Sequence, residues 1–572
     1  METFSSLVTL LAYRAETQPD ERAYVFLSDR GTEEAVISFR QLHDAASALA
    51  RRLTKITQSG DRALLVFPPG LEFIVAFFGC QIARVIAVPM MVPRRQSARD
   101  SSAAIVANCE PAVALTSPAL ANRSDLRARF RNDRIQWLPV DLALAEPGIA
   151  DLPLPNSEDI AFLQYTSGST SDPKGVAVSH ANLLANLEMI RLALGNTRQS
   201  TYVNWVPLYH DMGLILNALQ TLYLGSLCML MAPNAFMQRP LNWLRAIHHY
   251  RAEVACGPNF SFDLCVSRYR ADQMDNIDLS CWKVALNGAE PVHAETIRRF
   301  RDTFAGHGFD PDAMFPAYGM AEATLLIAGG RRGAGCVTRM VSQSGLQAHE
   351  VRAPADPADM QTLVGCGRAL VNERIAIVEP DSGELLSSDR VGEIWVHGPN
   401  VARNYWRNEE ATRTGLHAAI AGADEDASWL RTGDLGFLDA DGELFITGRI
   451  KDLIIVRGNN HYPQDIEATV QALHPALRQN GGAAFSVPDD REEETLVIVQ
   501  EIERTERNRI DAAEIVGLIR EAVSDQHELF ARHIVLIRPG SLPKTTSGKI
   551  QRSLTRKLWA ENRLNVLAGP AA

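Results

Sequence analysis

The chain has 572 residues, of which 46% are hydrophobic and 22% are charged. These values are typical of a globular protein of about three or four domains and exclude disordered and fibrous classes. With 57 Lys and Arg residues against 68 Asp and Glu residues, the formal net charge is -11, which argues against a general nucleic-acid-binding protein. No two of the eight cysteines have CxxC spacing, which argues against a zinc site or a thioredoxin-like redox pair.

Residues 1–21 contain no basic segment, and their short apolar run ends in charged residues, so a signal peptide is not expected. Two longer apolar stretches lie at 73–92 and 213–232, but polar residues such as Gln81 and Asn217 interrupt them. A membrane-spanning helix needs about 20 mostly apolar residues. Both stretches are therefore interpreted as a buried helix followed by a core strand. We expect a cytoplasmic protein that does not span a membrane.

Residues 62–92 alternate in the manner of a βαβ unit. Apolar runs at 62–67 and 85–89 flank a helix-like stretch at 71–83, and Pro-Pro-Gly follows the first run. Similar short apolar runs return at 113–115 and 254–256. This pattern predicts an α/β fold built on a parallel sheet that is covered on both faces.

The part of the chain after Gly448 has a different pattern. Helices are expected near 463–473 and from Asp511, and strands are expected at 483–487, 495–502 and 534–537. This alternation over ~120 residues predicts a small, separate α+β domain. The acidic tract at 489–494 is interpreted as a solvated hairpin loop.

The sharpest local motif is the loop Tyr-Thr-Ser-Gly-Ser-Thr-Ser-Asp-Pro-Lys-Gly-Val at 165–176. It follows an apolar run at 160–163 and precedes a helix expected to begin near Ser179. Backbone N–H groups, hydroxyls and Lys174 supply the donors and the positive charge that a polyphosphate needs. The lysine precedes a glycine, so this is not a Walker A loop. A flexible Ser/Gly linker is the alternative.

Together with four further segments, this loop resembles the adenylate-forming superfamily, which includes acyl-CoA synthetases and nonribosomal adenylation domains. The further segments are Ala-Tyr-Gly-Met-Ala-Glu-Ala-Thr at 317–324, Arg-Thr-Gly-Asp-Leu-Gly at 431–436, Gly-Arg-Ile-Lys-Asp at 448–452 and Pro-Lys-Thr-Thr-Ser-Gly-Lys-Ile-Gln-Arg at 543–552. All of them occur in the family's order and cover nearly the whole chain. The resemblance implies that the 165–176 loop holds the β- and γ-phosphates of ATP.

The resemblance also implies the site residues. It gives Lys549, Glu322 and His210 as catalytic, with Glu322 as the Mg2+ ligand and Lys549 as a compact positive charge for the phosphate and carboxylate. His210 has a supporting role, and a buried core histidine is its alternative. The implied ATP-binding residues are Thr166, Ser167, Gly168, Ser169, Thr170, Lys174, Gly288, Ala289, Glu290, Tyr318, Gly319, Met320, Asp434 and Arg449.

The same resemblance implies a domain organisation. A large multi-subdomain N-terminal body spans 1–447, a hinge spans 448–452 and includes Lys451, and a small mobile C-terminal domain spans 453–572. In the family the small domain rotates after adenylation and carries its lysine out of the site. Four other cations near Lys549 are interpreted as an exposed basic face: Lys544, Arg552, Arg556 and Lys557.

Several segments look like fatty acyl-AMP ligases in particular. They are Pro-Leu-Tyr-His-Asp-Met-Gly-Leu-Ile at 207–215, and Cys-Gly-Pro-Asn-Phe at 256–260, which resembles the acyl-pocket segment. Phe236, Phe260, Phe262 and Met231 are possible acyl-chain neighbours, and plain core residues are the alternative. A long charged stretch at about 330–365 matches the position of an insertion that in this branch is thought to restrain the small domain. A disordered surface loop is its alternative.

The sequence thus predicts an ATP- and Mg2+-dependent ligase that converts a fatty acid to acyl-AMP. The acyl group is then transferred to the phosphopantetheine thiol of an acyl carrier protein or of a carrier domain of a polyketide or nonribosomal synthase. A fatty acyl-CoA synthetase on the same fold is the closest alternative. A catalytically inactive acyl- or nucleotide-binding protein is the alternative of another class.

Overall fold

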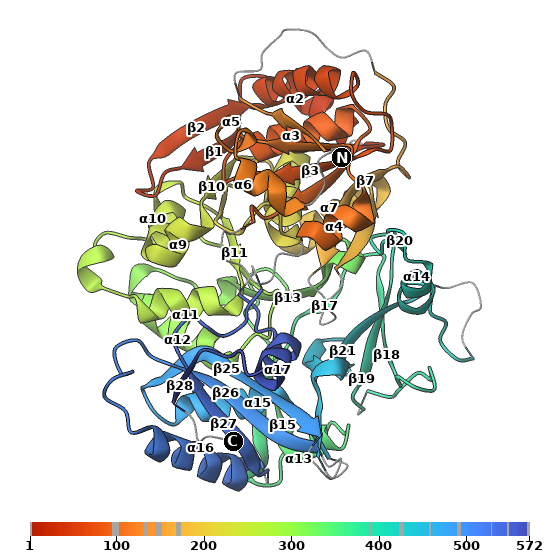
Figure 1. Ribbon diagram of the computed structural model, residues 1–572. Coiled ribbons are helices and arrows are strands. Elements are labelled where there is room, and N and C mark those ends of the chain that lie inside the picture. The colour runs from red at the N-terminus through yellow and green to blue at the C-terminus, as the bar shows by residue number, and fades with distance from the viewer. Residues whose placement is uncertain are drawn as a thin grey trace.

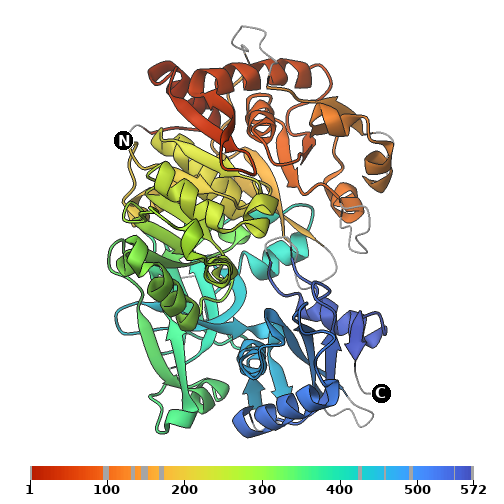
Figure 2. The same ribbon diagram turned by 90° about the vertical axis from the view of Figure 1, so that its left-hand side faces the viewer.

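The computed structural model is shown in Figures 1 and 2. It describes residues 3–93, 102–130, 135–142, 152–166, 173–388, 390–422, 428–456, 459–488, 494–527, 529–545 and 548–568. In Figure 1 the first third of the chain lies at the top, the middle third below it, and the C-terminal strands and helices at the bottom. The molecule has a mixed α/β fold with a large N-terminal body and a smaller C-terminal domain.

Two large sheets organise the N-terminal body. Within the described residues, the first has the order β17 (Arg368–Ala369), β14 (Leu326–Gly329), β13 (Met314–Gly319), β12 (Val284–Asn287), β11 (Val254–Gly257), β9 (Tyr202–Asn204), β10 (Cys228–Met231), β1 (Arg22–Leu27) and β2 (Glu33–Ser38). The second has the order β20 (Asn404–Tyr405), β8 (Lys174–Ser179), β7 (Ile160–Thr166), β4 (Ile86–Met90), β3 (Arg62–Val66), β5 (Val113–Thr116) and β6 (Gln136–Pro139). Their central strands are parallel and buried, which explains their continuous apolar runs.

Two smaller sheets complete the molecule. One belongs to the body and has the order β18 (Arg374–Val378), β19 (Gly392–His397), β21 (Leu430–Leu438) and β22 (Leu444–Arg449). The other forms the C-terminal domain, with the order β25 (Leu477–Pro488), β26 (Glu494–Ile502), β27 (Ala531–Ile537) and β28 (Val566–Ala568). Two strand pairs are separate from these sheets: β15 (Thr338–Ser342) with β16 (Met360–Val364), and β23 (Ile454–Val456) with β24 (Asn459–His461).

Helices cover the sheets and connect the strands. Those of the body are α1 (Leu7–Thr17), α2 (Phe39–Leu53), α3 (Glu72–Ile82), α4 (Ser102–Cys109), α5 (Pro118–Ala121), α6 (Ser124–Arg127), α7 (His180–Leu194), a π-helix at Met212–Leu219, α8 (Gln220–Leu224), α9 (Pro233–Gln238), α10 (Leu241–His249), α11 (Asn259–Ser267), α12 (Ala294–Phe304), α13 (Gln343–Gln347) and α14 (Glu409–Gly415). Those of the C-terminal domain are α15 (Pro463–Ala472), α16 (Ala512–His527) and α17 (Arg552–Ala560).

The expected local patterns are confirmed. The βαβ unit is β3, α3 and β4, with the two strands paired in parallel. Helix α7 begins one residue after Ser179, whose hydroxyl accepts a hydrogen bond from the Asn182 N–H at 3.1 Å and so caps the helix. Within the described ranges, each helix is too short or too polar to cross a membrane. The acidic tract expected as a hairpin loop lies outside these ranges, apart from Glu494 at the start of β26.

The C-terminal domain has a hydrophobic core of its own. Ile466 of α15, Ile498 of β26 and Ile519 of α16 are fully or almost fully buried in one cluster that is separate from the main core. Burial of such side chains stabilises each by about 1.5–3 kcal/mol relative to exposure. The helices and strands expected after Gly448 are present, and they build this α+β unit as predicted.

The stretch at 330–365 is structured and lies against the C-terminal domain, as Figure 1 shows for α13 and β15. It contains β15, α13 and β16 rather than a plain surface loop. Asn460 donates from Nδ2 to the Gln347 carbonyl at 3.0 Å, and Gln361 donates from Nε2 to Asp465 Oδ1 at 2.9 Å. The phenol of Tyr462 donates to the Leu346 carbonyl at 3.3 Å. The stretch at 330–365 therefore contacts the C-terminal domain through side-chain hydrogen bonds.

Candidate active site

The loop at 165–176, here called the phosphate loop after its expected role, lies between two strands of the second sheet. Strands β7 and β8 form an antiparallel pair in which Thr166 lies opposite Lys174. The ammonium of Lys174 lies 5.0 Å from the centre of the Tyr405 ring, a distance at which a cation and an aromatic face attract each other. The four residues expected between them, Ser167, Gly168, Ser169 and Thr170, lie outside the described residues.

Glu322 lies in a short 3-10 helix, Ala321–Ala323, which follows β13. Its side chain is buried, and Oε1 accepts a hydrogen bond from the Tyr405 phenol at 2.9 Å. Burial raises the pKa of Glu322. Thr324, two residues further on, has φ 65° and ψ -60°, a conformation that costs a β-branched residue energy. Its hydroxyl donates to the Asn400 carbonyl at 2.6 Å and so holds the strained turn.

Asp434 forms a pair of strong contacts on the third sheet. Its Oδ1 accepts from Arg449 Nε at 2.6 Å, and its Oδ2 accepts from the phenol of Tyr318 at 2.7 Å. The β21–β22 register places Asp434 opposite Arg449. The negative charge of Asp434 raises the pKa of Arg449. Asp434, Arg449 and Tyr318 are therefore adjacent, although 116 residues separate Tyr318 from Asp434.

Two groups of the expected ATP-binding residues lie at the ends of neighbouring parallel strands. Gly288, Ala289 and Glu290 follow β12, while Tyr318 and Gly319 end β13 and Met320 comes next. A β-carbon at Gly288 would lie 2.7 Å from the Ala317 carbonyl oxygen, and one at Gly319 would lie 1.9 Å from the Leu325 carbonyl oxygen. Only glycine fits at these two positions. Ala289 has a left-handed φ of 66°, which is strained for a residue with a β-carbon.

Asn287 ends β12 and is fully buried beside these residues. It donates from Nδ2 to Asn259 Oδ1 at 3.3 Å, while its own Oδ1 has no hydrogen-bond partner among the described residues. An unpaired buried acceptor is costly. The amino group of adenine is a donor of the required kind, so the end of β12 fits a nucleotide base. Asn287, which directly precedes Gly288, was not among the expected site residues.

Lys549 reaches the same site from the C-terminal domain. Burial and the positive charge of Arg449 lower the pKa of Lys549, while the carboxylates of Asp211, Asp434 and Glu290 oppose that shift. These charges belong to three different segments of the body. The structure thus brings the expected lysine together with the expected Asp434, Arg449 and Glu290.

Glu290 and the residue before Lys549, Gly548, both contact Phe260 of helix α11. Glu290 Oε1 accepts from the Phe260 N–H at 2.6 Å, and burial raises the pKa of Glu290 to about 7. Gly548, directly before Lys549, has φ 89°, and a β-carbon there would lie 2.8 Å from the Phe260 ring. The lysine loop is therefore in close contact with the expected acyl-pocket segment.

Phe260 is part of a group of aromatic side chains. Its ring centre is 6.0 Å from that of Trp205, which stacks on Phe236 at 3.9 Å. Trp243 packs edge-on against both Phe236 and Phe262. Phe236 and Phe262 are fully buried, whereas Phe260 is only partly buried and is the member that contacts the lysine loop.

His210 is paired with a residue that the sequence analysis did not select. Its Nδ1 lies 2.6 Å from Asp211 Oδ1, which also accepts from the Met212 N–H at 2.7 Å. Burial would raise the pKa of Asp211, but His210, Lys549 and the Met212 N–H outweigh it, and the net shift is downward. Asp211 lies in the His-Asp-Met-Gly motif, so the signal was present in the sequence.

Two of the four cations near Lys549 were wrongly expected to be exposed. Arg552 is largely buried because it forms ion pairs with Glu467 and Asp452. Lys544 is partly buried and donates to the Asn480 carbonyl at 2.5 Å. Arg556 and Lys557 are exposed as expected. The acidic partners of Arg552 lie 85 and 100 residues away, so the local basic composition could not reveal them.

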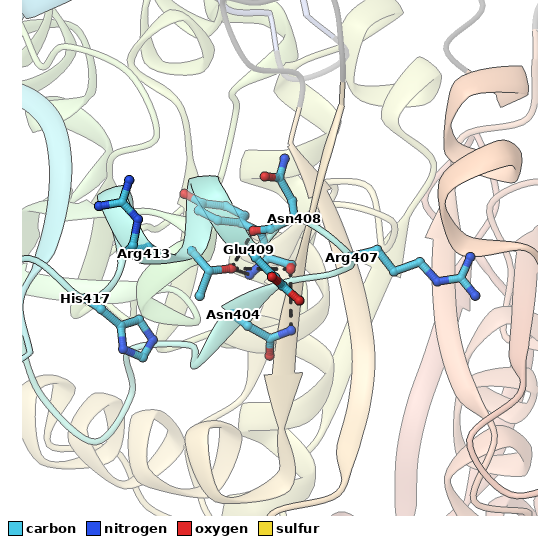
Figure 3. A pocket seen from close by; sticks show the side chains of 8 residues that line it. Asn404, Arg407, Asn408, Glu409, Arg413 and His417 are labelled. Carbon is cyan, nitrogen blue, oxygen red and sulfur yellow. Dashed lines mark hydrogen bonds between the residues drawn. The ribbon is translucent and has the colours of Figure 1, made fainter.

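A pocket of about 410 Å³ is lined by residues of β20, of α14 and of the segments next to them, with Tyr405 among them. Figure 3 shows Asn404, Arg407 and Asn408 around it, with the Arg413 and His417 side chains at one end. Its arginines already have acidic partners, because Arg407 pairs with Glu110 and Arg413 with Glu410. Its lining includes none of the charged residues described around Lys549, and we assign no ligand to it.

The residues present also fit a metal-bound polyphosphate. No cluster of three or more His, Cys, Asp or Glu side chains able to hold a metal occurs in the described part of the chain. Mg2+ needs no such cluster, because it is usually held by one or two carboxylates together with substrate phosphates and water. The buried carboxylate of Glu322, close to Tyr405 and through it to Lys174, is suited to this kind of site.

Comparison with known proteins gives a consistent assignment. The family model described as AMP-binding enzyme matches residues 11–406, and one described as Disco-interacting protein 2-like, AMP domain, matches residues 451–568. The medium-chain-fatty-acid–[acyl-carrier-protein] ligase JamA of Moorena producens (strain JHB) is 44% identical over 98% of this chain and 96% of its own length.

A solved structure of a fatty acid AMP ligase from Legionella pneumophila is 38% identical, with a TM-score of 0.75, and the match covers 99% of this chain and 98% of that one. Another, from a study of fatty acyl-adenylate ligases from E. coli and L. pneumophila, is 31% identical with a TM-score of 0.88 and covers 98% of both chains. The chain therefore belongs to the AMP-binding enzyme family, in the branch of adenylate-forming enzymes that contains the fatty acyl-AMP ligases.

Proposed function

We propose that this protein is a fatty acyl-AMP ligase that uses ATP to convert a fatty acid to its acyl-adenylate with release of pyrophosphate. It then transfers the acyl group to the phosphopantetheine thiol of an acyl carrier protein. The observation that carries the proposal is the position of Lys549, whose charge interacts with Asp211, Asp434 and Glu290 of the large body. Relatives named as fatty-acid–[acyl-carrier-protein] ligases support the choice of substrate and acceptor.

The chemistry requires two anions to meet. A carboxylate oxygen of the fatty acid attacks the α-phosphorus of ATP, and the bond from that phosphorus to the bridging oxygen breaks, so that pyrophosphate leaves. Lys549 supplies positive charge where the attacking carboxylate and the α-phosphate approach each other. Asp434 accepts hydrogen bonds from the ribose hydroxyls, and the ends of β12 and β13 hold the adenine. His210, oriented by Asp211, lies beside the carboxylate.

Lys174 and the phosphate loop bind the β- and γ-phosphates in this scheme. Glu322 would hold a Mg2+ ion, which when bound would neutralise charge on the phosphate oxygens. The Tyr318 phenol and Arg449 already hold the Asp434 carboxylate in place, so it needs little reorganisation when ATP binds.

We also propose the domain organisation that this function needs. The body spans 1–447, the hinge spans 448–452 and the small domain spans 453–572, so that rotation at the hinge would withdraw Lys549 after adenylation. The insertion at about 330–365 would restrain that rotation through its contacts with the small domain. Such a restraint would favour a carrier protein over free CoA. We expect the protein to act in the cytoplasm.

The test is fatty-acid-dependent exchange of labelled pyrophosphate into ATP, measured over a series of acids from short to long. Medium-chain acids are included because two relatives are named for them. The product assay then offers free CoA and a holo acyl carrier protein side by side. Exchange followed by acyl transfer to the carrier is the expected result. Efficient acyl-CoA formation would favour a fatty acyl-CoA synthetase, and no exchange with any acid would favour a binding protein.

A further inference from the structure

Tyr405 belongs to none of the motifs that carry the family resemblance, yet it contacts two of the expected ATP-site residues at once. Its phenol donates to Glu322 Oε1 at 2.9 Å, and its ring faces the Lys174 ammonium at 5.0 Å. The Tyr405 side chain is buried, and Lys174 is partly buried. One tyrosine thereby joins the expected metal ligand to the expected phosphate-binding lysine.

The backbone around Tyr405 supports the same connection. Residues 399–406 are here called the bridging segment. Within it, Tyr405 of β20 lies opposite Val176 of β8, the strand that begins at Lys174. The Trp406 N–H donates to the Gly175 carbonyl at 2.7 Å. On its other side, the Ala402 N–H donates to the carbonyl of Glu322 at 2.8 Å. The bridging segment is therefore hydrogen-bonded both to Gly175, which is next to Lys174, and to Glu322.

Asn400 fixes the start of the bridging segment. Its carbonyl accepts from the hydroxyl of the strained Thr324, and its Nδ2 donates to the Ala323 carbonyl at 3.2 Å and to Glu373 Oε1 at 2.9 Å. Asn182 of α7 donates from Nδ2 to the carbonyls at 399 and 401. These bonds leave Tyr405 little freedom to shift relative to Glu322.

We propose that Tyr405 is a positioning residue for metal-bound ATP, a role that rests on the proposed function. Its phenol O–H fixes one oxygen of the Glu322 carboxylate and leaves the other oxygen for the metal. Its ring keeps the Lys174 ammonium at the opposite side of the same polyphosphate. The metal ligand and the lysine are thereby held in fixed positions relative to one side chain. A hydrogen bond to a charged group and a cation facing a buried ring are both strong enough for this role.

Two substitutions separate the two contacts. Tyr405→Phe removes the O–H and keeps the ring opposite Lys174, whereas Tyr405→Leu removes both. For Tyr405→Phe we expect the KM for MgATP in the exchange assay to rise about tenfold, while the KM for the fatty acid stays the same. Tyr405→Leu is expected to raise it further. Thermal unfolding of each variant reports whether the fold is intact.

A binding measurement makes the test independent of turnover. Titration of the protein with Mn2+ and ATP, without fatty acid, is followed by the electron paramagnetic resonance signal of free Mn2+. Tyr405→Phe is expected to weaken Mn-ATP binding about tenfold but to leave ATP binding without metal almost unchanged. In Glu322→Gln the same Tyr→Phe change is expected to have little further effect.

The control is Tyr269→Phe, because the Tyr269 phenol contacts His307 at 3.1 Å and neither residue belongs to the expected ATP site. It should leave Mn-ATP binding unchanged. Parent-like Mn-ATP binding by Tyr405→Phe would overturn the positioning role. A parent protein without pyrophosphate exchange would instead overturn the proposed function, and the Mn-ATP titration would still decide the role of Tyr405.

Discussion

Arg552 donates from Nη1 to Asp452 Oδ2 at 3.1 Å while its Nε and Nη2 both contact the Glu467 carboxylate at 2.7 Å. Asp452 belongs to the expected hinge, and Arg552 lies three residues after Lys549. The lysine loop and the hinge are therefore connected by one largely buried guanidinium, which is 16% exposed.

Arg552→Ala should lower the free energy of unfolding of the small domain by about 3–5 kcal/mol, because it leaves two largely buried carboxylates without their cation. Urea denaturation measures the loss. Arg556→Ala is the matched control, since Arg556 is exposed on the same helix and should change stability by about 0.5 kcal/mol or less. Equal stability of the two variants would mean that the ion pairs contribute nothing.

Lys549→Ala should slow adenylation by about 10²- to 10³-fold, because it removes positive charge from the point where the two anions meet. Pyrophosphate exchange measures the rate, and equilibrium dialysis checks that ATP still binds. Lys557→Ala, on the exposed face of α17, should exchange at the parent rate. An undiminished rate in Lys549→Ala would remove this lysine from the mechanism.

Asp434→Asn should raise the KM for ATP about tenfold, because a neutral amide accepts hydrogen bonds more weakly than a carboxylate. A second substrate locates the effect: the parent should discriminate against 3′-deoxy-ATP, and Asp434→Asn should lose much of that discrimination. If the variant discriminates as well as the parent does, Asp434 does not bind the ribose.

Stability should depend on pH through Glu373. Burial raises the pKa of Glu373 to about 8, above the ordinary value of 4.5 that it has when unfolded. The stabilisation it provides is therefore fully present below pH 4.5 and is lost as the pH rises through 8. Relative to Glu373→Gln, which cannot ionise, the parent should become progressively less stable between these values.

Urea denaturation of both proteins at pH 5, 6.5 and 8 measures this difference. The control is Glu514→Gln on the exposed face of α16, which should follow the parent at each pH. A difference between parent and Glu373→Gln that does not change with pH would contradict the assignment.

Weakening the contacts of the insertion with the small domain should increase acyl-CoA formation relative to transfer to a carrier protein. The double variant Gln343→Ala and Gln361→Ala removes the contacts to His527 and Asp465 while leaving the adenylation residues intact. Product analysis with CoA and holo carrier together gives the ratio. Met340→Ala, which changes an exposed side chain of the same insertion, should not alter it.

The motifs could be predicted from the sequence because each is a short, contiguous segment of the chain. Asp434 and Tyr318 could be selected individually, but the 2.7 Å bond between them depends on how two sheets meet. Tyr405 was missed for a related reason, since its partners Glu322 and Lys174 come from elsewhere in the chain. The basic cluster near Lys549 was misread at Arg552 because local composition does not reveal distant acidic partners.

The contact between Gly548 and Phe260 leaves no clearance between the two domains at that point. Alanine or any larger residue at 548 would have both a left-handed backbone and a β-carbon against the ring, so it would hold the small domain away from the large one. This contact between the domains thus lies at the expected acyl-pocket segment. Whether the domains can close, and hence whether Lys549 can arrive, would then be decided by the position of a single phenyl ring.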